Sequence, residues 1–309
     1  MNKMKFLTLM ISLIVFLSCS AAKKTVSEEK YPVRDFEMLE KYVGPKKKLA
    51  IAQFENATRF GKRRLGDNIT SVLTTELAKT NRFTLLERER VDKILEQVAL
   101  SQTGLTEGTL EQIQLLDADF ILTGAVTHYA VQTTGSSNIF TQSKKQTAEV
   151  KADARLIDTR SGEIILSESG EGKAEKEFSK VLGMGTTGGY DESLELDAFR
   201  AAVYNMTINL IRALDQKPWI CDVVEISEEG LYIDSGKRSN LKIGDSLDVY
   251  FRGDAVKNLS GNIIGYKETL QGTGIVTGYI GEDGAIVRMF DYTNLRLPLI
   301  CKMHVSAAK

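Results

Sequence analysis

The sequence has little histidine and lacks the motifs that mark the common classes of enzyme. Only two of its 309 residues are histidine, His128 and His304, which is too few for most acid–base or zinc sites. It contains no Gly-x-x-x-x-Gly-Lys-[Ser/Thr] phosphate loop, no His-Glu-x-x-His and no Gly-x-Ser-x-Gly. We therefore expect a protein without catalytic, metal-binding or cofactor-binding residues.

The sequence also lacks an excess of charge of either sign. Its 40 basic and 41 acidic residues leave a net charge of −1, whereas a nucleic-acid-binding protein normally carries a basic excess. The basic clusters at 46–48 and 62–64 are better explained as solvated surface, because acids and bases balance elsewhere. With 42% hydrophobic residues, the chain has enough apolar side chains to bury a core. We expect a globular protein with no nucleic-acid partner.

The N-terminal residues have the pattern of a secretory signal. A basic start at 1–5 precedes the apolar run 6–17, which at about 18 Å is too short to span a bilayer as a helix. No later apolar run is long enough either. Leu17-Ser18-Cys19-Ser20 resembles the lipoprotein signal, which implies that Cys19 is acylated and becomes the new N-terminus. The alternative is an ordinary signal peptide that carries a cysteine. We expect a signal peptide at 1–18 and a lipidated tether at 19–47.

The segment 48–217 alternates between strand and helix patterns before a hairpin and a long helix. The expected elements are a strand at 48–56, a helix ending near Thr80, a short strand at 83–87, two helices starting near 91 and 110, a central strand at 120–131, strands at 147–157 and 163–173 around a turn, and a helix at 193–215. This order predicts an α/β fold with helices packed on a mixed sheet.

After Pro218 only short strand-like runs separated by glycine turns remain. This spacing predicts a small all-β, barrel-like domain over 218–309. Cys221 and Cys301 lie near the two ends of this segment. In an oxidising compartment they would be able to form a disulfide between its first and last strands. The alternative is two buried thiols that never meet, and sequence alone does not decide between them.

Several segments before residue 215 resemble, in order and spacing, motifs of the CsgG (curli assembly and transport) family. The opening strand ends in Phe54-Glu55-Asn56, and residues 82–88 resemble the family's Arg-Phe-x-Leu-Leu-Glu-Arg strand. Asp117-Ala118-Asp119-Phe120 precedes the central strand, and 158–163 is close to the family's Asp-Thr-x-Thr-Gly-Glu. The resemblance implies a CsgG-like α/β domain and a protein that is not an enzyme.

Residues 232–249 resemble the small β-barrel at the end of flagellar assembly protein T and of some CsgG relatives. Asn240 stands where that pattern usually has glycine. Asparagine tolerates a left-handed turn better than most residues, so we expect the departure to be mild.

The family resemblance also implies a mode of action. Its founding members form rings in the outer membrane, and each subunit gives two hairpins to a shared export channel. By this resemblance the chain is an outer-membrane lipoprotein facing the periplasm, with membrane, copies of itself and other envelope or secreted proteins as partners, in secretion or curli-like surface-structure biogenesis. The candidate membrane strands at 141–155 and 170–182 are crowded with charge and lack aromatic girdles. The second hypothesis is a monomeric, periplasm-facing binding or regulatory lipoprotein, similar to activators of cell-wall synthases.

Overall fold

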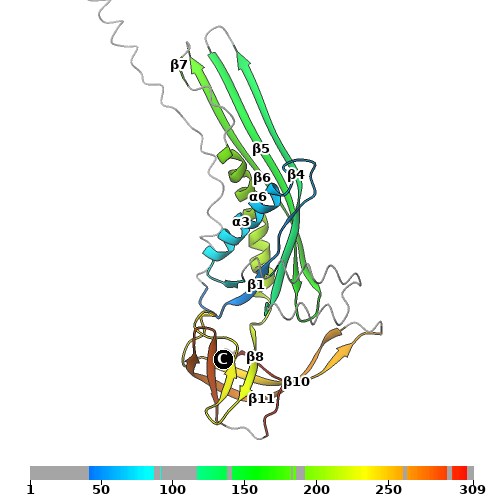
Figure 1. Cartoon of the computed structure of the whole chain (residues 1–309), viewed down its shortest axis with the longest axis vertical. Helices are drawn as coiled ribbons and strands as arrows, with labels where there is room; N and C mark the ends of the chain where they lie inside the picture. The colour runs from blue at the N-terminus through cyan, green and yellow to red at the C-terminus, as the bar shows by residue number, and fades with distance from the viewer. Residues whose placement is uncertain are drawn as a thin grey trace, which may run out of the picture. The chain divides into compact units, whose positions relative to one another are not determined.

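The computed structural model describes residues 42–86, 91, 117–137, 141–181, 184–185, 192–259, 263–290 and 294–304. Described residues up to 215 form a mixed sheet with two helices, and those from 220 form a closed barrel (Figure 1). The first group consists of β1 Lys47–Ile51, β2 Glu55–Asn56, α3 Arg64–Lys79, β3 Phe83–Leu85, β4 Phe120–Ser137, β5 Thr141–Asp158, β6 Ile164–Val181, β7 Met184–Gly185 and α6 Glu192–Asp215. The two helices expected near 91 and 110 lie almost wholly outside the described residues.

The sheet combines parallel and antiparallel strands, in the order β3-β1-β4-β5-β6-β7. The strand β1 runs parallel to both β3 and β4, and β2 also pairs in parallel with β4. From β4 to β7 the neighbours are antiparallel. The prediction of an α/β fold with a mixed sheet is confirmed, and helical spacing correctly located α3 and α6.

Helix α6 lies directly on the backbone of β6 because two glycines leave room for it. A Cβ atom on Gly170 would lie 2.1 Å from the carbonyl oxygen of Ala202, and one on Gly172 would lie 2.0 Å from that of Ala198. Both distances are far inside van der Waals contact. The sequence Gly-Glu-Gly at 170–172 therefore sets how closely the helix approaches the sheet.

The strands β4, β5 and β6 are longer than the sequence pattern predicts. Each has 18 residues, or about 60 Å of extended chain, and Figure 1 shows them continuing past the end of α6. The core strands expected from apolar alternation ended near residues 131, 147 and 173, whereas the candidate membrane strands at 141–155 and 170–182 reach the outer parts of β5 and β6. The additional segments are rich in Ser, Thr, Gln and Lys, which carry no apolar alternation. Pairing between neighbouring strands, which the three share along almost their whole length, extends them.

The C-terminal strands close into a barrel in the order β10-β11-β12-β9-β8-β13. Their bounds are β8 Ile220–Ile226, β9 Leu231–Ile233, β10 Ser246–Lys257, β11 Ile263–Ile280, β12 Gly284–Met289 and β13 Leu299–Met303. A single apolar cluster that includes Leu247, Val249 and Val287 fills the interior. Asn240 has φ +58°, so asparagine does occupy a left-handed position there, as expected. The division into domains at Lys217 stays a prediction.

Neither of the described helices combines the length and apolar character that a bilayer crossing requires.

Candidate functional site

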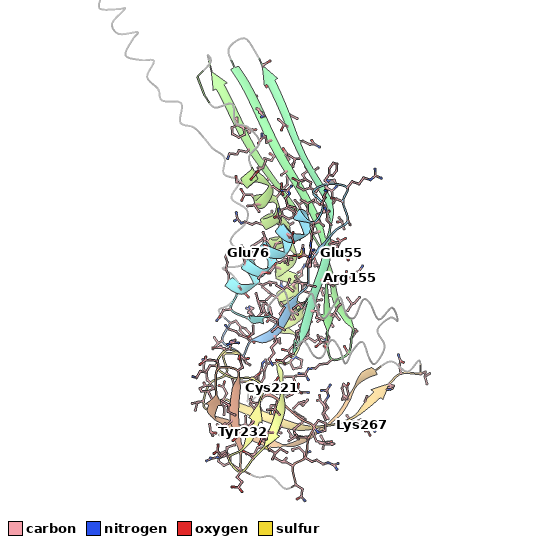
Figure 2. The ribbon with its side chains drawn as sticks, viewed as in Figure 1. Glu55, Glu76, Arg155, Cys221, Tyr232 and Lys267 are labelled. Carbon is pink, nitrogen blue, oxygen red and sulfur yellow. The ribbon has the colours of Figure 1, made fainter. Side chains whose placement is uncertain are left out.

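The residues predicted from the sequence fall in different places. Cys19, the predicted lipidation site, lies outside the described residues. Cys221 on β8 and Cys301 on β13 are directly opposite each other across two neighbouring antiparallel strands. Both are buried free thiols (Figure 2 labels Cys221). The structure brings the two cysteines together, and the disulfide between them stays a prediction.

The two histidines are not part of a common site. His128 lies exposed on β4, and His304 follows β13, where its Nδ1 is 2.8 Å from Oδ1 of Asp248. Within the described ranges, no group of three or more His, Cys, Asp or Glu side chains has an arrangement that would hold a metal ion. The chemistry that these residues offer is ion pairing and surface contact.

One face of the long strands belongs to the core of the protein. In β5 alternate residues from Gln146 to Leu156 are buried. Ala152 is opposite Gly170 and Val150 is opposite Gly172, so these residues share the face that packs against α6. The apolar side of the candidate membrane strand at 141–155 is therefore buried from residue 146 onward, and at residues 150–152 it shares the face that packs against α6.

The other face of β5 and β6 carries a ladder of alternating charges, here called the charged face. Its members are Lys145, Glu149, Lys151, Glu171, Lys173 and Glu175. Ion pairs connect the two strands, with N–O distances of 2.6 Å for Lys145–Glu175, 3.0 Å for Lys151–Glu171 and 3.5 Å for Lys173–Glu149. Lys173 also pairs along β6 with Glu175, at 3.1 Å. Hydrogen bonds from Lys145 and Lys173 lower the pKa of the Glu175 carboxyl. Such a face is stable in water and costly to place in lipid.

Along most of their length, the outer edges of β4 and β6 have no neighbour among the described strands. At its first residues β4 pairs with β1 and β2, as far as Val126, and β7 pairs with β6 only at Lys180 and Val181. We call β4 from residue 130 to 137 and β6 at residues 164–170, 172–175 and 177–179 the free edges, since no described strand pairs with them on that side. Backbone N–H and C=O groups along such edges are able to pair with another strand.

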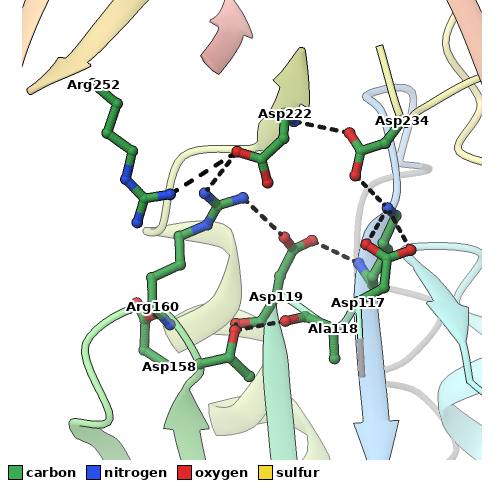
Figure 3. Close-up of polar contacts among 10 residues, drawn as sticks. Asp117, Ala118, Asp119, Asp158, Arg160, Asp222, Asp234 and Arg252 are labelled. Atoms are coloured by element: carbon green, nitrogen blue, oxygen red, sulfur yellow. Dashed lines mark hydrogen bonds and ion pairs between the residues drawn. The ribbon is translucent and has the colours of Figure 1, made fainter. Parts of the chain in front are cut away.

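A network of charged side chains lies where one end of the sheet meets the barrel (Figure 3). This polar junction comprises Lys48, Asp117, Asp119, Asp158, Arg160, Asp222, Asp234 and Arg252. Most of these residues line a small cavity of about 110 Å³. The network connects β1, the start of β4 and the β5–β6 turn with β8, β9 and β10.

Lys48 is the central cation of the polar junction. Its Nζ atom is 2.9 Å from a carboxylate oxygen of Asp117 and 2.8 Å from one of Asp234. Its backbone N–H donates to Asp119 at 2.8 Å. Asp234 also accepts the backbone N–H of Asp222. Lys48 thereby links a strand of the sheet to a strand of the barrel.

Arg160 provides the second cation, from the turn between β5 and β6. Its guanidinium nitrogens are 3.7 Å from Asp119 and 3.6 Å from Asp222. Four residues of the polar junction occur in the motifs that resemble the CsgG family, at 117–120 and 158–163: Asp117, Asp119, Asp158 and Arg160. The signal was therefore visible in the sequence. The meeting of these motifs with Asp222 and Asp234 was not, because it depends on which end of the sheet the barrel contacts.

Asp119 gives the polar junction a dependence on pH. Burial raises the pKa of this carboxyl to about 6, although the Lys48 backbone N–H and Arg160 act to lower it. Because the pKa is higher in the folded chain than the ordinary 3.8, ionised Asp119 destabilises the fold above pH 6, and the penalty disappears as pH falls toward 4.

We expect the difference in unfolding free energy between wild type and Asp119→Asn to change by on the order of 3 kcal/mol between pH 7 and pH 4. Wild type should gain stability relative to the variant as the pH falls. Urea titrations at several pH values measure this difference, and Asp254→Asn at an exposed position of β10 is the control. A constant difference across this range would contradict the assigned pKa.

A second buried carboxylate, Glu195, joins both helices to the sheet. It lies near the start of α6 and accepts hydrogen bonds from Arg64 at 2.7 Å, Asn68 at 3.1 Å and the hydroxyl of Tyr129 at 2.7 Å. The side chains of Glu195 and its three partners come from α6, α3 and β4. The sequence contains no pattern that predicts this contact, since the partners are far apart along the chain. With three donors around it, Glu195 has a structural role.

A groove of about 590 Å³ lies at the end of α6. Two buried cations line it: Lys47 donates to the backbone oxygen of Leu214 at 2.6 Å, and Arg82 pairs with Asp215 at 2.7 Å. Both cations therefore stabilise the C-terminal turn of the helix, where backbone carbonyls lack helical partners.

Comparison with known proteins gives a family and several relatives. The sequence model of the family described as "Curli production assembly/transport component CsgG" matches residues 34–241. A protein of Neisseria meningitidis serogroup B that is named as a lipoprotein is 27% identical over 188 residues, which covers 58% of this chain and 81% of that protein.

Similarity to solved structures is weaker. A hypothetical protein from Chlamydia trachomatis is 12% identical with a TM-score of 0.32, over 55% of this chain and 96% of that chain. The PelC dodecamer from Paraburkholderia phytofirmans is 14% identical with a TM-score of 0.30, over 52% of this chain and 86% of that chain.

Proposed function

Because the chain belongs to the CsgG family, we propose that it is a non-enzymatic lipoprotein of the cell envelope that acts by assembling with copies of itself. The family's description as a curli production assembly/transport component supports a role in secretion or in the biogenesis of curli-like surface structures. The observation that carries the assembly is the pair of free edges on β4 and β6.

The proposed anchor is a lipid on Cys19. Cleavage before this residue would leave a tether at 19–47, the α/β domain at 48–217 and the barrel domain at 218–309. The lipid would hold the protein on the outer membrane, facing the periplasm. The name of the related meningococcal protein supports lipidation, since that protein is 27% identical to this chain.

The free edges lie on opposite sides of the same three strands. A contact between β4 of one copy and β6 of the next would continue the sheet from subunit to subunit. Such a contact is heterologous. It closes into a ring when a whole number of equal rotations between neighbouring copies adds up to 360°. The strands would gain backbone hydrogen bonds that they lack within one described chain.

An export channel is the narrower version of this proposal. Its strands would have to present one face to lipid over roughly 9–11 residues. In β5 only the part before Gln146 lies outside the buried face, and the charged face carries several lysines. Both observations weigh against a channel. Conductance in planar bilayers tests it directly, and a bilayer that stays closed would exclude it.

The alternative is a monomeric, periplasm-facing binding or regulatory lipoprotein. The charged face supports this reading, because its lysines and glutamates already satisfy one another and are stable in water. In that case the free edges would remain solvated or would bind a strand of a different protein.

The mass of the detergent-extracted, lipidated protein separates these functions. We expect native mass spectrometry to give a closed multiple of the subunit mass. A monomer under the same conditions would contradict assembly and favour the regulatory alternative.

Two adjacent substitutions, Thr133→Pro and Thr134→Pro, test the role of the β4 edge. Successive residues in a strand direct their backbone N–H groups to opposite sides, so one proline removes a hydrogen bond to β5 and the other blocks the free edge. We expect one variant to remain folded, with an unchanged melting temperature, but to lose the oligomer. Assembly does not use this edge if both variants keep the oligomer. The same conclusion follows if the two variants do not differ in melting temperature or oligomeric mass.

A further inference from the structure

Cys221 and Cys301 form one of the four residue pairs that join the first and last strands of the barrel. The strands β8 and β13 are antiparallel neighbours, and the two cysteines are partners in their register. Directly opposite residues in antiparallel strands have Cα atoms about 4.5–5.5 Å apart and side chains on the same face. This separation falls inside the range of about 4.4–6.8 Å that disulfides require.

Both side chains point into the barrel core. Cys221 is 2% exposed and Cys301 is fully buried, in the apolar cluster that includes Val223 and Leu299. The two thiols lie within hydrogen-bond contact of each other. Desolvation by burial is the largest cause that raises the pKa of Cys221, so in the closed barrel this thiol is neutral and unreactive. Oxidation therefore has to occur while the barrel is still open.

We propose that Cys221 and Cys301 form a disulfide in the mature protein, which fastens the first strand of the barrel to the last. This disulfide rests on the proposed function for its location, since the bond needs the oxidising conditions of the cell envelope. The chain has three cysteines, and lipidation would occupy Cys19. No competing thiol would then remain in the mature chain.

The oxidant is a disulfide of a dithiol–disulfide exchange protein or of glutathione. One cysteine thiolate attacks the oxidant's S–S bond and forms a mixed disulfide, and the second thiolate then displaces the oxidant's remaining thiol. The two cysteines lose two protons and two electrons, and the oxidant gains them as two thiols. The new bond closes a loop of about 80 residues, which restricts the unfolded chain strongly.

The test uses the full chain, expressed with its own signal and extracted from membranes. The protein is quenched in acid, unfolded, treated with N-ethylmaleimide and digested with trypsin. Cleavage after Lys and Arg places Cys221 in the peptide 213–237 and Cys301 in the peptide 297–302. We expect a single species with their summed mass less two hydrogens, which separates into the two peptides on reduction. The double variant Cys221→Ser/Cys301→Ser should lack it.

Stability provides an independent measurement. Reduction should lower the melting temperature of wild type by roughly 10 °C and leave that of the double variant unchanged. A second sample is reduced, unfolded and refolded with oxidised glutathione, which tests the pairing without the envelope.

Two maleimide-modified peptides in both the membrane sample and the refolded sample would overturn the disulfide. If only the membrane sample carries free thiols and its N-terminal peptide carries no lipid, the compartment in the proposed function is wrong and the pairing stands.

Discussion

Replacing Gly172 by alanine is expected to lower the free energy of unfolding by about 3 kcal/mol or more. The added Cβ atom would lie 2.0 Å from the carbonyl oxygen of Ala198 and 2.4 Å from the backbone nitrogen of Ala202. Both atoms belong to the backbone of α6, so no side chain is able to rotate away. The helix would have to move off β6 and lose contacts of its buried apolar residues. Urea denaturation followed by circular dichroism measures the change as a lower midpoint.

Gly135→Ala is the matched control in the same three strands. A Cβ atom there would have its nearest contact, at 3.5 Å, with the backbone oxygen of Ser143, which is ordinary van der Waals contact. Alanine also restricts the unfolded chain more than glycine does. We expect this variant to be as stable as wild type or more stable by up to about 1 kcal/mol. Equal midpoints for Gly172→Ala and Gly135→Ala would contradict the close packing of α6 on β6.

Replacing Lys48 by methionine is expected to cost about 3 kcal/mol, because it removes one partner from a buried ion-pair network. The Lys48 side chain is 13% exposed and neutralises Asp117 and Asp234. Without it, Arg160 and Arg252 would have to balance the remaining carboxylates of the polar junction. The loss should be smaller at pH 5 than at pH 7, since protonation of Asp119 relieves part of the repulsion.

Lys79→Met separates this effect from the general cost of removing a lysine. Lys79 is 63% exposed, and among the described residues its ion pair is with Glu76, one helical turn away on α3. Such a pair contributes under about 0.5 kcal/mol. Thermal melts of both variants at pH 5 and pH 7 provide the comparison. A similar small loss for both would show that the polar junction contributes little to joining the sheet and the barrel.

The polar junction also explains why the family motifs lie at the ends of strands. Asp119 precedes β4, and Arg160 lies in the turn after β5, so both positions fall at the same end of the sheet. The family match covers residues 34–241, which includes Lys48, Asp119, Arg160, Asp222 and Asp234. A CsgG-like α/β unit and the start of the barrel are therefore matched together.

Secondary-structure type was readable from the sequence where one side of an element is apolar. The period of 3.6 residues located α3 and α6, and the Thr-Arg-Ser-Gly turn located the hairpin between β5 and β6. The length of β4 was underestimated, and β5 and β6 each join an expected core strand to a candidate membrane strand in one continuous strand. Their outer residues, such as Thr133 and Lys144, have no apolar alternation, and only pairing with neighbouring strands extends them.

The sequence by itself determined the mixed α/β class and the family. It also indicated that Asn240 tolerates a left-handed backbone conformation. These follow from local patterns: side-chain periodicity, motif order and backbone preferences of single residues. It did not determine what covers each strand face. An alternating strand such as β5 has the same pattern whether lipid, another subunit or a helix contacts its apolar side.

The tertiary structure alone decided that α6 covers β5 and β6, that Cys221 faces Cys301, and that Lys48 meets Asp234. The first depends on two glycines that let backbones approach, the second on strand register, and the third on which end of the sheet contacts the barrel. All three are contacts between residues far apart in the chain. Their energy depends on distance in space, which no local sequence pattern records.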